Sequence, residues 1–246
     1  MLPPPDKMKM NVSEAVQSRR TCRAFERRPV SKETVEELLS LASRAPSGGN
    51  TQPWHIYVVA GLQLQALTDA AFAHLRGAGG KITMDQEYAT YPRKVDMPVD
   101  MHKAYMRRRV QVAQNMWKLM GVTRDDAAGR VRALMENYRF WGAPVGMIVT
   151  VDRCCDRNAW GHAGLLLQTI ALLAVERGLA TAMLEAWGNL GNCVYDVLSI
   201  PFQKEVVWCG VALGYPDRSA NLSNVPTDRL SVPEFCQFQG FVSAKL

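Results

Sequence analysis

The stretch Ala45-Pro46-Ser47-Gly48-Gly49-Asn50-Thr51-Gln52-Pro53-Trp54 lies between a segment with helical periodicity and a predicted strand. Its small residues would let the backbone approach a flat ligand closely. Ser47, Asn50 and Gln52 add hydrogen-bond donors and acceptors that suit the polar edge of a ring. A plain connector between a helix and a strand favours the same residue types. The stretch is therefore either a ligand-binding loop or a connector, and its surroundings must decide.

Helical and extended patterns alternate on both sides of this stretch. Ser13 and Ser31 are the expected N-caps of two helices that precede it. The other predicted helices cover 62–75, 106–120, 124–137, 159–177 and 188–198, and the predicted strands cover 55–60, 144–151, 181–184 and 206–213. The helix at 159–177 is apolar nearly all round, which predicts a buried central helix. Residues 76–105 lack periodicity and predict a lid, an interface arm or disorder. This order predicts one α+β domain over residues 1–246.

The composition is that of an ordinary globular protein, with 48% hydrophobic and 21% charged residues. Among the 246 residues, 29 Lys and Arg stand against 23 Asp and Glu, which gives a formal charge of +6. Such an excess fits either a nucleic-acid surface or a built-in site for a phosphate-bearing ligand. Basic and aromatic residues are not interleaved, so no nucleic-acid partner is expected.

Membrane insertion, secretion and metal binding are not expected either. No apolar run reaches the roughly 18 residues of a membrane-spanning helix, and residues 1–10 lack the apolar core of a secretory signal. The six cysteines form no CxxC pair, which favours reduced thiols and a cytoplasmic location. The four histidines lie far apart without the spacing of metal ligands.

Several common catalytic and nucleotide-binding motifs are absent. The chain has no GxGxxG after a strand, no GxxxxGK[ST], no GxSxG and no HExxH. The sequence therefore gives no motif support for a dinucleotide-binding fold, NTP hydrolysis at a phosphate loop, acyl transfer at an elbow serine or zinc proteolysis.

Three further segments could contribute to a site for a phosphate-bearing ligand. Arg19-Arg20-Thr21-Cys22-Arg23 concentrates guanidinium groups, whose planar forks suit phosphate oxygens, although a solvated basic turn has the same composition. A short predicted strand ends at Glu185-Ala186, where the backbone N–H groups at a helix start are free to donate. Arg229 follows in the irregular tail, where a lone arginine is most often a surface residue.

Taken together and in this order, these segments resemble the FMN-dependent nitroreductase superfamily. Arg19-Arg20-Thr21-x-Arg23 is similar to the family pattern Arg-Arg-Ser-x-Arg, and 45–54 is similar to the family's most recognisable motif. The segments 138–145, 178–185 and 211–216 follow at family-like spacing. The resemblance covers 12–241, and the long middle insert resembles the nitrobenzoate-reductase-like branch.

The resemblance implies a nitroreductase-like three-layer sandwich, in which helices flank a central, mostly antiparallel sheet, and an intertwined homodimer with FMN at the interface. The implied reaction is ping-pong. NADH or NADPH gives a hydride to flavin N5, and a nitroaromatic or quinone-like acceptor then takes two electrons. Positioning dominates such a transfer, so no catalytic side chain is expected. The alternative on the same fold is a specialised biosynthetic flavin oxidoreductase or dehydrogenase.

The resemblance also implies contacts between individual residues and the cofactor. Arg19, Arg20 and Thr21 would hold the FMN phosphate and ribityl chain together with Arg229. Arg23 would lie at the pyrimidine edge, where a cation stabilises the anionic reduced flavin. The residues expected to line the ring, in the same or the neighbouring subunit, or to add polar contacts beside it are Pro46, Ser47, Gly48, Asn50 and Gln52. Met183 and Leu184 are expected to pack on the ring face. Glu185 and Ala186 are expected to present backbone N–H groups to flavin N5 and O4.

Three positions depart from the family pattern. Thr227 stands where many relatives carry a second phosphate-binding cation. His162 stands where many relatives carry an acid, and both a structural and a functional role remain open for it. Ala186 replaces a glycine but keeps the backbone N–H group. Asn137 and Arg139 are additional candidates for the pyrimidine edge.

Overall fold

The computed structural model describes residues 10–77, 87–88, 97–155 and 157–241. Within them, four strands form one sheet in the order β1-β2-β4-β3, and every neighbouring pair is antiparallel. The strands are β1 (Trp54–Ala60), β2 (Val145–Asp152), β3 (Ala180–Leu184) and β4 (Glu205–Gly214). The predicted antiparallel sheet is therefore confirmed.

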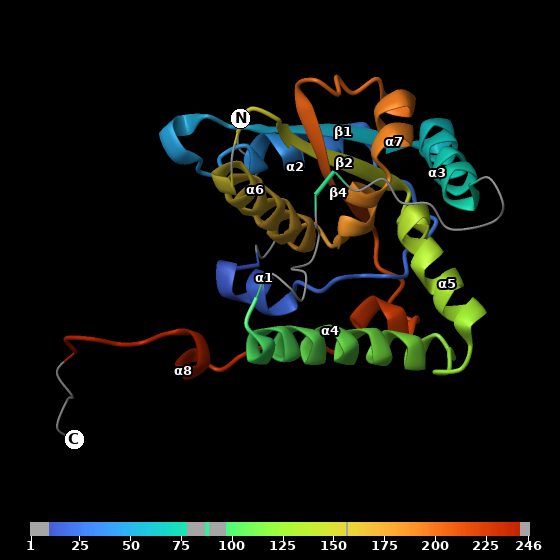
Figure 1. Cartoon of the computed structure of the whole chain (residues 1–246). Coiled ribbons are helices and arrows are strands. Elements are labelled where there is room, and N and C mark those ends of the chain that lie inside the picture. Colours follow the sequence, from blue (N-terminus) through green and yellow to red (C-terminus); the bar gives the residue numbers. More distant parts are fainter. Residues whose placement is uncertain (1–9, 78–86, 89–96, 156, 242–246) are drawn as a thin grey trace.

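Helices cover both faces of this sheet (Figure 1). On one face α2 (Lys32–Ala42) and α6 (Arg157–Glu176) pack with the strands, and on the other α3 (Gly61–Arg76) and α7 (Gly191–Leu198) do so. The central strand β2 is buried at every position except its last, as expected for a strand with helices on both sides. This arrangement is the three-layer α+β fold predicted from the sequence.

The remaining described helices and 3₁₀ turns lie around these layers. They are α1 (Val12–Ser18), α4 (Val99–Leu119), α5 (Ala127–Met135), α8 (Val232–Phe235), η1 (Gly48–Asn50), η3 (Glu136–Gly142), η4 (Glu185–Asn189) and η5 (Asn221–Asn224).

A β-bulge in β4 decides which side chains face which layer. In β2, Val149 packs with α2 and α6, while its neighbour Ile148 packs with α3 and α7. Opposite them, β4 carries one extra residue, Trp208, between the partners of Val149 and of the residue after it. The extra residue turns Val207 toward α3 and α7, although Cys209, two positions later, faces α6.

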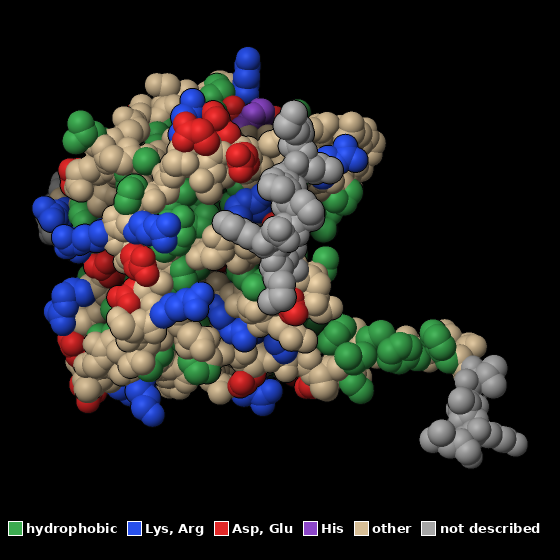
Figure 2. Space-filling view, turned by 180° about the vertical axis from the view of Figure 1, so that it is seen from behind, with side chains coloured by type: hydrophobic (Ala, Val, Ile, Leu, Met, Phe, Trp, Pro, Cys, Tyr) green, Lys and Arg blue, Asp and Glu red, His purple; other side chains and the backbone are tan. Residues whose placement is uncertain are grey.

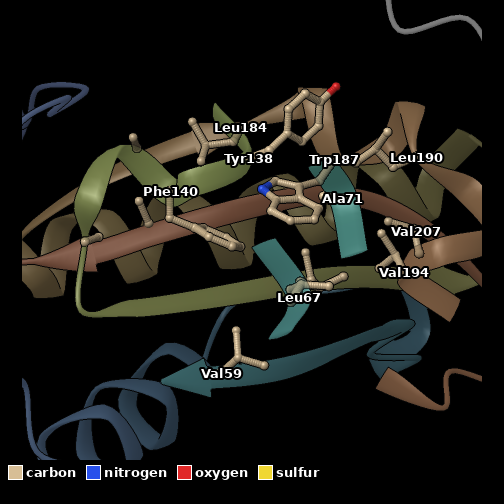
Figure 3. Packing of buried hydrophobic residues seen from close by; sticks show 14 of the residues in the cluster. Val59, Leu67, Ala71, Tyr138, Phe140, Leu184, Trp187, Leu190, Val194 and Val207 are labelled. Carbon is tan, nitrogen blue, oxygen red and sulfur yellow. The ribbon is translucent and has the colours of Figure 1, made fainter. Parts of the chain in front are cut away.

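The layer between the sheet and α3 and α7 is centred on Trp187 (Figure 3). Its indole is fully buried, stacks on Phe140 with ring centroids 4.8 Å apart and meets Tyr138 edge-on at 5.4 Å. Gly210 of β4 leaves room for the indole, because a Cβ at that position would lie 2.2 Å from a Trp187 ring atom. This aromatic packing holds η3 and η4 against the sheet.

Several predicted boundaries are wrong for local reasons. The N-cap of α1 is Asn11 rather than Ser13, because Asn11 and Glu14 form a reciprocal capping box. The helix predicted for 124–137 is α5, which ends at Met135 and is followed by η3, where Phe140 and Trp141 adopt positive φ. The helix predicted for 188–198 is instead the end of η4 followed by α7.

The irregular segment predicted for 76–105 is shorter than expected, because α4 begins at Val99. Of this segment, 78–86 and 89–96 lie outside the described residues. Glu87 and Tyr88 contact the body: Glu87 forms an ion pair with Arg153 at 2.7 Å, and the Tyr88 hydroxyl donates to the Trp208 carbonyl at 2.7 Å.

The helix α6 is not buried all round, contrary to the prediction. Its inner face, with Leu166 and Ile170, lies in the core, whereas Leu165 on its outer face is exposed. Among the described residues, α6 is long and apolar enough to cross a membrane by length and composition. Its packing against β2 and β4 is that of a core helix.

Candidate functional site

The three arginines predicted to bind a phosphate lie around one cavity. Arg19 follows the last residue of α1, Arg20 comes next, and Arg229 arrives from the C-terminal tail. Together with Gln168 of α6 they line a cavity of ≈ 780 Å³, here called the arginine cavity. Burial, and then the like charges of Arg229 and Arg20, lower the pKa of Arg19 from its ordinary value. A bound anion would relieve this repulsion.

Arg229 is held in place by its own segment and by α4. Its Nη1 donates to Thr227 Oγ1 at 3.0 Å and to the Asp228 carbonyl at 2.9 Å. Asn115 of α4 donates to the Pro226 carbonyl at 3.1 Å, which fixes the start of the same segment. The hydroxyl group of Thr227 thus orients the guanidinium of Arg229.

Thr21 and Arg23 belong to an extended segment that runs beside β3. Thr21 forms a parallel bridge with Thr181, and the next residue donates its N–H to the Thr181 carbonyl at 3.0 Å. The guanidinium of Arg23 lies 5.8 Å from the centre of the Trp141 ring. Burial lowers the pKa of Arg23, so this cation sits in a poorly solvated place.

The two additional candidates for the pyrimidine edge are placed differently. Asn137 accepts a hydrogen bond from the Trp141 indole at 3.1 Å, so it shares a neighbour with Arg23. Arg139 pairs instead with Glu136 at 3.1 Å, and its guanidinium lies 4.9 Å from the centre of the Phe72 ring. Of the two, only Asn137 shares a contact with Arg23.

The end of β3 presents one side chain and then a turn of backbone. Met183 is 38% exposed, whereas Leu184 is 3% exposed and belongs to the Trp187 core. Of these two residues, only Met183 therefore has a side chain open to a ligand. Glu185 and Ala186 begin η4 directly after β3, so the backbone N–H groups at the start of this turn lie beside Met183. The Tyr138 hydroxyl donates to the Ala186 carbonyl at 3.2 Å and orients this turn.

Residues 47–52, here called the 47–52 loop, adopt an uncommon backbone shape. Gly49, Asn50 and Gln52 have φ of 58°, 56° and 47°, in the left-handed region. The Gln52 N–H donates to Ser47 Oγ at 2.9 Å, and the Gln52 side chain donates to Asn50 Oδ1 at 3.2 Å. Pro46 precedes the loop and is exposed.

The loop and the arginine cavity lie at different levels of α6. The Gly48 N–H donates to Nε2 of His162 at 3.1 Å, whereas Gln168 of the same helix lines the cavity. Six helical residues correspond to roughly 9 Å along the axis. None of the loop residues lines the arginine cavity. The structure thus brings the arginines together and leaves the loop as a separate group beside them.

Sequence reasoning gave no role to several residues that shape this region. Gln168 and Asn115 are single polar residues within helical patterns, and nothing in those patterns distinguishes them from solvent-facing positions. Tyr138 lies in a family-like segment, and the sequence assigns no contact to it. The sequence leaves the function of His162 open, and the structure shows that its Nε2 accepts the Gly48 N–H.

Comparison with known proteins identifies the family. A family model, Nitroreductase family, matches residues 16–215. The chain belongs to the nitroreductase family. It is 33% identical to 4-nitrobenzoate reductase of Pseudomonas putida over 227 residues, which are 92% of this chain and 94% of that protein. It is 32% identical to chloronitrobenzene nitroreductase of Comamonas testosteroni, over 92% of this chain and 96% of that protein.

Solved structures of nitroreductases share the fold. The FMN and NADPH-dependent nitroreductase NfnB from sphigopyxis sp. strain HMH has a TM-score of 0.85 and 36% identity, covering 94% of this chain and 100% of that one. The FMN-dependent nitroreductase NfnB from Mycobacterium smegmatis, in complex with NADPH, has a TM-score of 0.81 and 25% identity, covering 92% of this chain and 97% of that one. The family and fold predicted from the sequence are confirmed.

Proposed function

We propose that this nitroreductase uses FMN, with NADPH or NADH as electron donor, to reduce a nitroaromatic or quinone-like acceptor by two electrons. The observation that carries the proposal is the convergence of Arg19, Arg20 and Arg229 on one cavity. A phosphate monoester with about two negative charges suits such a group of guanidinium forks. Relatives that depend on FMN and NADPH support the same pair of cofactors.

The described residues fit FMN along its length. The arginine cavity would hold the phosphate, and Arg23 would lie at the pyrimidine edge. The exposed side chain of Met183 would pack on the ring, and the backbone N–H groups of Glu185 and Ala186 would donate to flavin N5 and O4. When bound, FMN would supply the redox chemistry that carries two electrons from the nicotinamide cofactor to the acceptor.

The residues of the protein would act by binding and orienting. The poorly solvated guanidinium of Arg23 would stabilise negative charge at the pyrimidine edge more strongly than an exposed cation could. Tyr138 would keep the N–H groups of η4 aimed at the ring through its bond to the Ala186 carbonyl. No side chain is assigned a proton transfer, because hydride transfer depends mainly on distance and orientation.

The acceptor class is proposed from the relatives. Proteins that match more than nine-tenths of this chain are named for 4-nitrobenzoate, chloronitrobenzene and nitrobenzene. A small aromatic nitro compound is therefore the first acceptor to examine. The alternative of a specialised biosynthetic dehydrogenase has less support, because none of these relatives carries such a name.

We infer that the working unit is a homodimer. From Phe235, the last residue of α8, the chain extends away from the body of the subunit, as Figures 1 and 2 show. The side chains of Phe235, Phe238 and Phe241 on this arm are 67%, 66% and 79% exposed. Apolar side chains gathered in this way usually mark an interaction site. A second copy of the chain is the proposed cover, and its 47–52 loop could then line the flavin ring bound by the first.

We further propose a single FMN-binding domain over residues 1–246 and a cytoplasmic location. All six cysteines are free thiols, which suits a reducing compartment. Within the described ranges, no group of three or more His, Cys, Asp or Glu side chains could hold a metal ion.

Two measurements test the proposed function. The purified protein, after addition of FMN and removal of the excess, should keep the visible absorption of an oxidised flavin. The loaded protein should consume NADPH when 4-nitrobenzoate is present. A protein that retains no flavin, and shows no consumption of NADPH or NADH with any of several nitroarenes, would contradict the proposal.

A further inference from the structure

The 47–52 loop holds a backbone conformation that its own residues favour only weakly. Asn50 and Gln52 have left-handed φ values of 56° and 47°, which residues with side chains adopt uncommonly. Within the loop, Ser47 accepts the N–H of Gln52 at 2.9 Å and the N–H of Asn50 at 3.0 Å. Most loop residues are exposed, so burial adds little to the stability of this shape. To keep this conformation, the loop therefore needs a hydrogen bond to a rigid element outside it.

His162 of α6 accepts that hydrogen bond. Its Nε2 accepts the Gly48 N–H at 3.1 Å, across 114 positions of sequence. The imidazole also lies close against the loop, because a Cβ on Gly48 would stand 3.1 Å from Cε1 and 3.3 Å from Nε2 of His162. The bond requires an Nε2 without a proton, and therefore a neutral ring with its hydrogen on Nδ1. Leu166 and Leu167 anchor α6 in the core, so the acceptor is rigidly placed.

We propose that His162 is a positioning residue of the flavin site. By accepting the Gly48 hydrogen bond, it fixes the 47–52 loop, and with it Asn50 and Gln52, in the conformation that meets the flavin ring. This inference rests on the proposed function. The helix α6 then serves both parts of the site, because its Gln168 lines the arginine cavity.

A pair of variants separates the acceptor atom from the volume of the ring. In His162→Gln, Oε1 can accept a hydrogen bond near the place of Nε2, whereas His162→Leu fills comparable space without an acceptor. In the full-length protein without FMN, the Gly48 amide should exchange with deuterium roughly fivefold faster in the Leu variant than in the wild type, the change expected for one lost hydrogen bond. The Gln variant should exchange within about twofold of the wild type, because it keeps the acceptor.

FMN affinity should follow the same order. We expect the dissociation constant to rise roughly fivefold in His162→Leu and to return to within about twofold of the wild type in His162→Gln. His102→Leu is the matched control, because His102 is also half-buried but lies on α4. It should leave both Gly48 exchange and FMN affinity unchanged.

A double-mutant cycle tests the same contact by sterics. Gly48 does not have a left-handed φ, so Gly48→Ala is limited only by the space beside His162. The substitution should weaken FMN binding in the wild type and have a smaller effect in a His162→Ala background, where the ring is gone. Equal effects in the two backgrounds would overturn the proposed contact. This cycle also decides the matter if His162→Leu does not fold.

The outcomes distinguish the inference from the proposed function. A wild-type protein that binds no FMN contradicts the proposed function. If the wild type binds FMN and reduces the nitroarene, but His162→Leu has wild-type Gly48 exchange and FMN affinity, only the positioning role is refuted. Equal losses of affinity in His162→Leu and His162→Gln also refute it, because the acceptor atom would then not matter.

Discussion

The arginine cavity and the 47–52 loop are built in opposite ways. The cavity joins Arg19 and Arg229 from distant parts of the chain, and burial, followed by repulsion among its guanidinium groups, lowers the pKa of Arg19. The loop is contiguous, contains no charged residue and depends on backbone shape. An anion bound in the cavity would therefore add stability by offsetting these like charges. The loop carries no charge and is held by hydrogen bonds within the protein. Substitutions in the cavity should therefore change mainly FMN affinity, whereas substitutions in the loop should also change the stability of the flavin-free protein.

The largest effect is expected at the arginine cavity. Removing two charged contacts with Arg19→Ala and Arg229→Ala together should weaken FMN binding by about 3–4 kcal/mol, or several hundred-fold. The protein without FMN should unfold at the same or a slightly higher temperature, because like charges are removed. A fluorescence titration with FMN and a thermal melt without it measure the two effects. Arg132→Ala is the matched control, since Arg132 pairs with Asp126 on the surface, and an unchanged affinity in the double variant would contradict the assignment of the cavity.

The next largest effect is expected in the loop. Gly48→Val places a branched side chain against the His162 ring, where even a Cβ is tightly fitted at 3.1 Å. The loop must then move, and we expect at least a roughly tenfold loss of FMN affinity and largely colourless purified protein. The ratio of flavin to protein absorbance measures occupancy. Normal occupancy would show that the loop does not approach the ring.

A smaller effect is expected at Arg23, which belongs to neither region and would act on the reduced flavin. Arg23→Ala should lower the two-electron reduction potential of bound FMN by about 30 mV, which corresponds to about 1.4 kcal/mol. The affinity for oxidised FMN should differ less between Arg23→Ala and the wild type, because the oxidised flavin lacks the negative charge that the cation stabilises. Arg23→Lys, which keeps a cation, should shift the potential less. A potential identical to that of the wild type in Arg23→Ala would refute this role.

The smallest effect is expected at Asn50, and it tests whether the 47–52 loop keeps its left-handed backbone conformation. Asn50 has a φ of 56°, so Asn50→Gly should change the free energy of unfolding of the flavin-free protein by less than about 0.5 kcal/mol. Asn50→Val should lower it by about 1 kcal/mol or more, because a β-branched residue is strained in this region. Chemical denaturation measures both. Equal stabilities of the two variants would mean that the loop does not keep this φ in solution.

Local patterns predicted much of the fold. The four strands were placed to within about one residue at each end, because the apolar runs that form them are bounded by clear turn signals. Ser31 is the N-cap of α2 as predicted. The errors lie where a side chain outside the pattern intervenes. Asn11 is the N-cap of α1 because it forms a capping box with Glu14. Phe140 and Trp141 interrupt the predicted helix, because their burial offsets the cost of their positive φ.

The sequence by itself determined the family, the chemistry of the arginine segment and the composition of the 47–52 loop, because these depend on residue type and order. Only the tertiary structure decided which groups meet. It turned the Leu184 side chain into the core, paired Arg139 with Glu136 and joined Gly48 to His162. These outcomes depend on strand register and on contacts between residues far apart in the chain, which no local pattern encodes.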